Sequence, residues 1–173
     1  MNAILRHGDV AVDATMGNGK DTQFLCELVG EEGHVYAFDV QKEAVERTAA
    51  RLKEAGYENR ATLLLAGHET MKEHVQSAPP VVMFNLGWLP GAEHDVHSTA
   101  DGSVPALRAA LEALRPGGVL AAVLYSGKVI GDAEKQAALA FFKALPLTQY
   151  TVLVCEFANW AQTAPLPCFV IKK

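Results

Sequence analysis

The stretch VAVDATMGNGKDTQFL, residues 10–25, decides the fold. An apolar run ends in Asp13, passes through small residues and two glycines, and continues as an amphipathic pattern. This order predicts a buried strand, a tight glycine turn and a helix. In open α/β sheets, ligands bind at such turns, outside the carboxyl ends of the strands. The stretch therefore predicts both an α/β fold and the location of its site.

Strand-like and helix-like segments alternate through the rest of the chain. Continuously apolar strands separated by helices predict a mostly parallel sheet with helices on both faces. The last two strands follow each other without a helix, which predicts an antiparallel pair. The expected strands are Val10–Asp13, His34–Val40, Ala61–Gly67, Val81–Gly87, Val119–Tyr125, Tyr150–Phe157 and Cys168–Lys173. The expected helices are Asp21–Val29, Lys42–Ala55, Glu69–Gln76, Ser103–Leu114 and Gly131–Leu145, and a long polar loop is expected over Trp88–Gly102.

Length and composition predict one globular domain spanning residues 1–173, because half of the residues are hydrophobic and 20% are charged. A net charge of −5 disfavours a broad electrostatic grip on nucleic acid but leaves a local basic patch open. No secretory signal is visible, and no apolar run approaches the roughly 20 residues that span a bilayer. We therefore expect a cytoplasmic protein without a membrane partner. Cys26, Cys155 and Cys168 are expected to be buried, reduced thiols.

Two well-known nucleotide-binding motifs fit the glycine turn poorly. A phosphate-binding P-loop would need glycine where the chain has Ala14, and Ser or Thr where it has Asp21. The NAD fingerprint G-x-G-x-x-G matches Gly17 and Gly19 but has Thr22 at its third glycine. Acidic side chains beside the turn would also repel a pyrophosphate, which binds best to bare amides at a helix N-terminus.

S-adenosylmethionine fits the same residues better than NAD does. It carries a sulfonium cation and an ammonium group and has no phosphate, so Asp13 and Asp21 would attract it. The second strand ends in Asp39, and a carboxylate at that position accepts hydrogen bonds from ribose hydroxyls. An ordinary strand–turn–helix unit without a ligand is the remaining alternative.

Four segments in the same order resemble a known family: DATMGNGKDTQFL (13–25), AFDVQ (37–41), NLGWLPG (85–91) and ALRPGGVLAAVLYSG (113–127). They are similar to the rRNA methylase family of Rossmann-like class I methyltransferases, whose characterised branch is YtqB/MnmM. The resemblance implies a seven-stranded sheet with a reversed last strand and S-adenosylmethionine as the cofactor. It also implies methyl transfer to tRNA, converting 5-aminomethyl-2-thiouridine at the wobble position to 5-methylaminomethyl-2-thiouridine.

The resemblance also implies which residues form the site. Asn85, Trp88 and Leu89 would face the acceptor, with the Asn85 amide oxygen orienting an amine lone pair. Trp88 and Leu89 would desolvate the amine, and Trp88 could stack on the uridine. The cofactor would be held by Asp13, Thr15, Gly17, Asn18, Gly19, Asp21, Thr22, Asp39, Val40, Gln41, His68, Glu69 and Asn85. The chain departs from the family at Lys20 and Lys128, where histidine is common, and near Asn159.

Other polar clusters carry weaker signals. His94 and His97 stand three residues apart beside Asp95, but the loop context predicts a solvated segment, so no metal site is expected. HETMKEH (68–74) does not match H-E-x-x-H, and Ser126 lacks the first glycine of a hydrolase elbow. The side chains that could contact RNA phosphates are Lys128, Lys135 and Arg108.

Three functions remain open from the sequence. The favoured one is a methyltransferase that acts on tRNA as a possible homodimer, because a small acidic domain offers little surface to a tRNA. A methyltransferase acting on rRNA or a small molecule is the second, and the acidic isoelectric point near 5.6 favours a small molecule. A non-catalytic module that binds S-adenosylmethionine or a nucleotide is the third.

Overall fold

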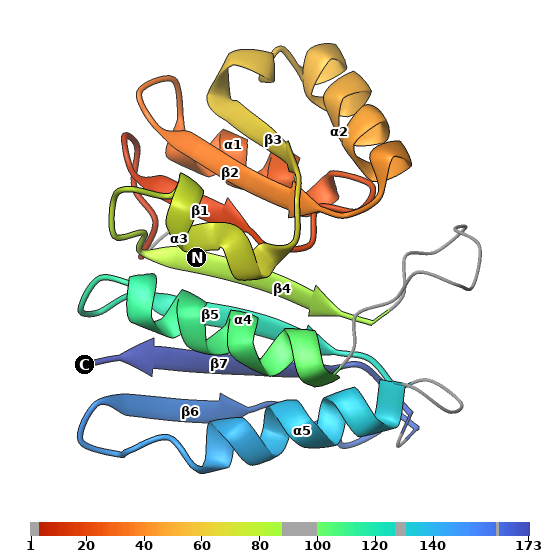
Figure 1. The fold of residues 1–173 in the computed structure, drawn as a ribbon, viewed down its shortest axis with the longest axis vertical. Helices are drawn as coiled ribbons and strands as arrows, with labels where there is room; N and C mark the ends of the chain where they lie inside the picture. Colours follow the sequence, from red (N-terminus) through yellow and green to blue (C-terminus); the bar gives the residue numbers. More distant parts are fainter. Residues whose placement is uncertain (1–3, 88–99, 127–130, 162) are drawn as a thin grey trace.

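The computed structural model describes residues 4–87, 100–126, 131–161 and 163–173. Within them, seven strands form one sheet in the order β3-β2-β1-β4-β5-β7-β6 (Figure 1). Neighbouring strands are parallel except that β7 runs antiparallel to both β5 and β6. The strands are β1 (Val10–Asp13), β2 (His34–Asp39), β3 (Ala61–Leu65), β4 (Val81–Leu86), β5 (Val119–Leu124), β6 (Tyr150–Val154) and β7 (Leu166–Lys172). The predicted fold class and the antiparallel final pair are confirmed.

Helices cover both faces of the sheet, as the sequence predicts (Figure 1). Residues of α1 and α2 pack with one set of strand side chains, and residues of α3, α4 and α5 pack with the other set. The helices are α1 (Lys20–Val29), α2 (Lys42–Ala55), α3 (Met71–His74), α4 (Ala100–Ala113) and α5 (Gly131–Lys143), with short 3₁₀ helices η1 (Glu58–Arg60) and η2 (His68–Thr70).

The first strand and helix show why the opening stretch folds in this way. Successive strand residues point to opposite faces, so Ala11 packs with the α1 side and Val12 with the α4 side, and both are fully buried. Leu25, Cys26 and Val29 lie at helical spacing on the buried face of α1. The layered arrangement therefore buries both apolar faces of the strand and the single apolar face of the helix.

The strand register positions the candidate site. Asp13 at the end of β1 lies opposite Ala37 of β2 and Met83 of β4. Asp39 and Asn85 are each two residues further along their strands, so they flank the turn that follows β1 from its two sides. Strand order reverses at β1, because β2 and β3 lie on one side and β4 and β5 on the other. Open α/β sheets bind ligands at this kind of position.

Several element boundaries differ from the predicted ones. Helix α4 begins at Ala100 rather than Ser103, so Gly102, predicted to belong to the preceding loop, is helical. Glycine has low helix propensity, but packing against the rest of the fold overrides such local preferences. Strand β7 begins at Leu166 rather than Cys168, because Pro167 sits at the start of the strand, where a missing N–H is tolerated.

One of the three cysteines was predicted incorrectly. Cys26 and Cys168 are buried, and burial raises the pKa of the Cys26 thiol to about 12 and that of Cys168 to about 11. Cys155 is exposed instead. It directly follows β6, the edge strand, where the apolar sequence around it is left uncovered. Among the described residues, no helix is both long and apolar enough to cross a bilayer.

Gly19 is the glycine that the turn requires most strictly. Its φ is +75°, and a Cβ added there would lie 2.7 Å from Oγ1 of Thr48 and 3.0 Å from the Thr48 Cα on α2. We expect Gly19→Ala to reduce the free energy of unfolding by about 2–4 kcal/mol, since backbone strain and overpacking add. Gly56→Ala is the control: φ is +73°, but nothing lies within 4 Å. Equal losses in urea denaturation would show that the Thr48 contact has no effect.

Candidate functional site

The turn after β1 is tied to the tip of β2 through one carboxylate. Asp39 Oδ2 accepts a hydrogen bond from the Gly17 backbone N–H at 3.0 Å, and its Oδ1 accepts one from the Gln41 N–H at 2.9 Å. The Asp39 side chain is half-buried, so it still reaches the surface. Each carboxylate oxygen has a second lone pair, which leaves acceptor capacity for hydroxyl groups of a ligand.

Asp13 holds the same turn from the inside. Its side chain is fully buried, with Oδ1 accepting from the Thr15 N–H at 3.1 Å and Oδ2 accepting from the Thr22 hydroxyl at 2.6 Å. The pKa of the Asp13 carboxyl is raised to about 7, chiefly by burial; the nearby carboxylates of Asp21 and Asp39 contribute to the rise, and the hydrogen bonds from Thr22 and Thr15 oppose it. Thr22 is fully buried as well. Both residues are placed to support the turn, and their predicted contact with a cofactor stays a prediction.

The raised pKa of Asp13 predicts a pH-dependent stability. Between pH about 4 and about 7, the folded state keeps a proton that the unfolded chain, with a pKa near 3.8, has lost. The stability that this group contributes is therefore present below pH 4 and is lost as pH rises through 7. Relative to Asp13→Asn, we expect the wild type to lose roughly 4 kcal/mol of unfolding free energy over this range. Urea titrations of both proteins from pH 4 to 8 measure this difference, and a constant difference would contradict it.

Helix α2 fixes the outer side of the turn. Arg51 Nε donates to the Asn18 carbonyl at 2.8 Å, and Arg47 Nη1 donates to the Asn18 side-chain oxygen at 3.3 Å. The Thr48 hydroxyl donates to the Gly17 carbonyl at 3.3 Å. These helix residues were not predicted from the sequence. The spacing of Arg47 and Arg51, four residues apart on one helix face, is the signal that could have indicated them.

Asn85 connects the turn to the tip of β4. Its backbone N–H donates to the Thr15 hydroxyl at 2.7 Å, and its side-chain Nδ2 donates to Asp21 Oδ2 at 2.6 Å. Asp21 lies in the first turn of α1, and both side chains are half-buried. The structure thus brings together Thr15, Asp21 and Asn85, which the sequence analysis assigned to the site from separate segments.

The predicted residues after β2 and β3 lie around the same turn. The His68 ring nitrogen Nδ1 is 3.2 Å from the Ala14 carbonyl oxygen, and the ring packs edge-to-face against Phe84 with centroids 5.6 Å apart. Val40 is 61% exposed beside Asp39, an apolar surface that a flat ring could cover. Glu69 is exposed, and no contact with the turn is found for it among the described residues.

Some of the predicted residues cannot be placed. Trp88 and Leu89 lie outside the described residues, as do the loop histidines His94 and His97 with Asp95, and Lys128. Within the described ranges, no group of three or more potential metal ligands is found. Of the other basic side chains, Lys135 Nζ donates to the Ser126 hydroxyl at 2.8 Å, and Arg108 lies over the Phe141 ring.

Two further side-chain contacts at the carboxyl edge of the sheet were not predicted from the sequence. Tyr125, 42% exposed, follows β5 and packs so closely against Gly87 that a Cβ at residue 87 would lie 2.8 Å from the Tyr125 Cβ. Ser103 in α4 donates to Glu134 in α5, and both side chains are almost completely buried. No local sequence motif predicts either contact, because each one joins segments that are distant in the sequence.

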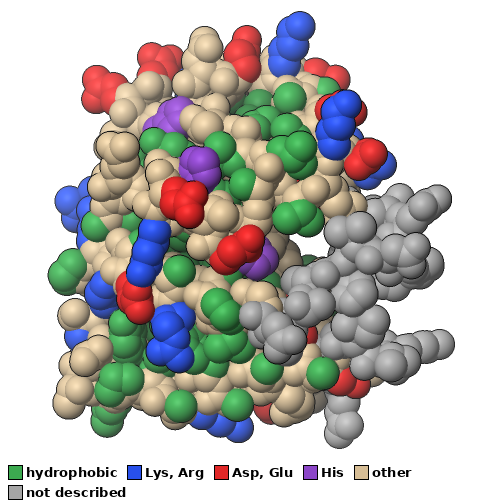
Figure 2. Space-filling view, viewed as in Figure 1, with side chains coloured by type: hydrophobic (Ala, Val, Ile, Leu, Met, Phe, Trp, Pro, Cys, Tyr) green, Lys and Arg blue, Asp and Glu red, His purple; other side chains and the backbone are tan. Residues whose placement is uncertain are grey.

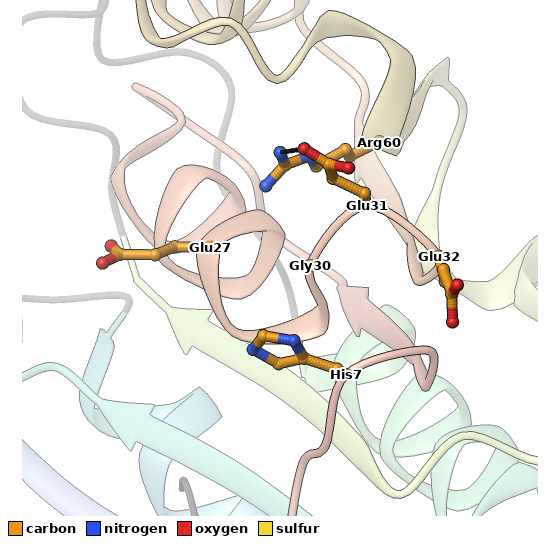
Figure 3. A pocket seen from close by; sticks show the side chains of 6 residues that line it. All are labelled: His7, Glu27, Gly30, Glu31, Glu32 and Arg60. Carbon is orange, nitrogen blue, oxygen red and sulfur yellow. Dashed lines mark ion pairs between the residues drawn. The ribbon is translucent and has the colours of Figure 1, made fainter.

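The charges on one face of the molecule and the position of one hollow can be compared with the place of the glycine turn. On the face seen in Figure 2, acidic and basic side chains are intermixed and form no large basic patch. An open, largely acidic hollow lies at the opposite edge of the sheet, before β1, β2 and β3 (Figure 3). There, Arg60 pairs with Glu31 at 3.6 Å. Since this edge carries the amino ends of the parallel strands, the hollow is separate from the candidate site.

The charges around the turn determine which ligand it suits. The carboxylates of Asp13, Asp21 and Asp39 are close enough for the latter two to raise the pKa of the first. A phosphate group would face repulsion from Asp21 and Asp39, and from Asp13 in the fraction of molecules in which it is ionised, whereas a cation would be attracted. The glycines of the turn allow the backbone to approach a ligand closely. The arrangement is therefore suited to a nucleoside that carries a positive charge rather than a phosphate.

Comparisons with known proteins agree with this description. A family model described as "Putative rRNA methylase" matches residues 35–171. The crystal structure of a "putative rRNA-methylase" from Clostridium thermocellum superposes with a TM-score of 0.97 at 36% identity, covering 99% of this chain and 92% of that one. The crystal structure of a "putative methyltransferase" from Streptococcus mutans in complex with SAH superposes with a TM-score of 0.90 at 36% identity, covering 99% and 93% of the two chains.

A curated relative extends the comparison to a named reaction. The chain is 35% identical over 181 aligned residues to the chloroplastic tRNA (mnm(5)s(2)U34)-methyltransferase of Arabidopsis thaliana. The alignment covers 98% of this chain but 65% of the plant protein, so the chain spans somewhat less than two thirds of that relative.

Proposed function

The chain belongs to the rRNA methylase family, and from this premise we propose that it transfers a methyl group from S-adenosylmethionine to RNA, at the aminomethyl nitrogen of the tRNA wobble uridine. The observation that carries the proposal is the set of three carboxylates around the glycine turn. Two kinds of comparison support it: the Arabidopsis relative is named for this tRNA position, and the Streptococcus mutans structure contains SAH.

The residues present fit S-adenosylmethionine. Asp39 would accept hydrogen bonds from the ribose hydroxyls, since its oxygens already accept from Gly17 and Gln41 with capacity to spare. The exposed Val40 would lie against the adenine. The positive charges of the methionine end would be attracted by Asp21, and Asp13 would add to this attraction in the fraction of molecules in which it is ionised. When bound, the cofactor supplies an electrophilic methyl group on a positively charged sulfur.

The chain's own residues would mainly position the acceptor. An amine attacks through its lone pair, so its N–H groups need an acceptor that turns the lone pair in the required direction. The Asn85 amide oxygen is suited to this, because its amide nitrogen is already committed to Asp21. Trp88 and Leu89 would exclude water from the amine and keep it unprotonated. After transfer, the surplus proton on the nitrogen passes to solvent.

A cofactor assay tests the first part of this proposal. We expect S-adenosylmethionine and S-adenosylhomocysteine to raise the melting temperature of the purified protein, and NAD and ATP to leave it unchanged. A shift produced by NAD or ATP alone would overturn the cofactor assignment and return the glycine turn to the nucleotide-binding alternatives.

The acceptor is tested by mass spectrometry of nucleosides. In tRNA from a strain that lacks the gene, we expect 5-aminomethyl-2-thiouridine to accumulate and its methylated product to disappear. Purified protein should then methylate that tRNA in vitro and leave rRNA from the same strain unmodified. Methylation of rRNA instead would reassign the acceptor within the same family.

Association into a homodimer stays a prediction, which light scattering with and without tRNA would examine.

A further inference from the structure

We infer that Asp21 is a positioning residue for Asn85: its carboxylate fixes the Asn85 side chain so that the amide oxygen, and not the NH₂ group, faces the acceptor amine. This inference rests on the proposed function. It adds a second role to the one that the proposed function gives Asp21, which is attraction of the positively charged methionine end of the cofactor.

The contact itself is short and polar. Asn85 Nδ2 donates to Asp21 Oδ2 at 2.6 Å, which is short for an N–H···O contact, and hydrogen bonds to a charged acceptor are shorter than neutral ones. The two residues are 64 positions apart in the sequence, on α1 and β4, so only the folded sheet brings them together. The Asn85 backbone N–H is held separately by the Thr15 hydroxyl at 2.7 Å. Main chain and side chain of Asn85 are thus fixed by different partners.

The chemistry of the amide explains why this contact matters. The oxygen and nitrogen ends of an asparagine side chain are nearly identical in shape, so packing alone does not choose between them. A carboxylate only accepts hydrogen bonds and therefore selects the NH₂ end. Among the described residues, no hydrogen bond to Asn85 Oδ1 is found, which leaves that oxygen for the substrate. A rotated amide would present its own N–H groups to the N–H groups of the amine. The partial positive charges on these hydrogens would repel one another.

Replacement of the Asp21 carboxylate by an amide removes the preference for one orientation of the Asn85 side chain. In Asp21→Asn, the residue at 21 offers either an oxygen or an NH₂ group, so both orientations of Asn85 become accessible. We expect kcat for tRNA methylation to fall about 10- to 100-fold, because the acceptor is misaligned in much of the population. The Kd for S-adenosylmethionine, measured by calorimetry, should change less than about tenfold. Glu43→Gln, which removes one exposed carboxylate from the first turn of α2, should match the wild type.

A reciprocal exchange provides the sharper test. Asn85→Asp alone places two carboxylates against each other and should be at least as inactive as Asp21→Asn. In the double variant Asp21→Asn/Asn85→Asp, the amide at 21 donates to the carboxylate at 85, whose second oxygen again faces the acceptor. Total charge is unchanged. We expect activity within about fivefold of the wild type, because paired residues in direct contact are not additive.

A measurement without RNA separates this inference from the proposed function. In the wild type, the Asn85 side-chain NH₂ resonances, assigned by their loss in Asn85→Asp, should show one proton shifted downfield by the carboxylate. Asp21→Asn should remove that shift. An unchanged resonance, a double variant no more active than Asp21→Asn, or parallel loss of cofactor affinity and activity would each overturn the inference. A wild type that methylates no tRNA would overturn the proposed function, while the resonance would still decide the orientation of Asn85.

Discussion

Asn85→Ala is expected to abolish most methyl transfer while leaving the protein folded and able to bind its cofactor. We expect kcat to fall by about 100-fold or more, since the substitution removes the group that orients the acceptor amine. Asn85 is half-buried, so water can solvate Asp21 after the substitution, and the loss of stability should be small. Single-turnover methylation of tRNA lacking the modification measures the rate of the transfer step, and steady-state turnover of the same tRNA gives kcat.

A matched asparagine provides the control for this prediction. Asn59 is exposed in η1, just before β3 and at the opposite edge of the sheet, so Asn59→Ala makes the same chemical change away from the site. It should retain full activity. Full turnover by Asn85→Ala would remove the residue from its acceptor role, and a large loss of S-adenosylmethionine affinity would move it to the cofactor instead.

Asp39→Ala should weaken binding of S-adenosylmethionine by about 100-fold, or roughly 3 kcal/mol, the order expected for losing two hydrogen bonds to a charged acceptor. The substitution also leaves the Gly17 and Gln41 N–H groups without their carboxylate, so the turn itself loses a restraint. Isothermal titration calorimetry with S-adenosylmethionine gives the affinity.

Two further variants test the role of Asp39 in cofactor binding more closely. Glu46→Ala removes a carboxylate from the exposed face of α2, where it pairs with Lys42 at 3.4 Å, and should leave affinity unchanged. Asp39→Asn keeps the shape but only one acceptor oxygen, and should bind with intermediate affinity. If Asp39→Ala and Glu46→Ala bind equally well, the ribose assignment is wrong.

The fold could be predicted because the strand and helix signals are local. Apolar runs of strand length, glycine stops and amphipathic spacing occur within a few residues of one another, as in Val10–Val29. The boundaries that were wrong depend on distant contacts. Helix α4 extends back to Ala100 through Gly102, and Cys155 is exposed because β6 forms the edge of the sheet. Neither property is encoded in the neighbouring residues.

Some residues of the candidate site could likewise be predicted from the sequence, and others could not. Asp13, Gly19 and Asp39 could be predicted from motifs, since each stands at the end of a strand or in its turn. The hydrogen bond from Asn85 to Asp21, and the arginines that hold Asn18, could not, because they join segments that are 29 to 64 residues apart. Sequence patterns identify which side chains approach a ligand, but the partners that orient them emerge only from the packed structure.

The linked contacts Asp13–Thr15–Asn85–Asp21 also carry an evolutionary consequence. Two of these contacts use a backbone N–H, that of Thr15 or that of Asn85, which any residue except proline would keep at that position. The contact between Asp21 and Asn85 joins two side chains, so a substitution at one of these positions leaves a polar group without its partner at the other, and selection would act on the two positions as a pair. Homologous chains that diverge at position 21 should show a compensating change at position 85, and lineages that have abandoned catalysis should lose both together.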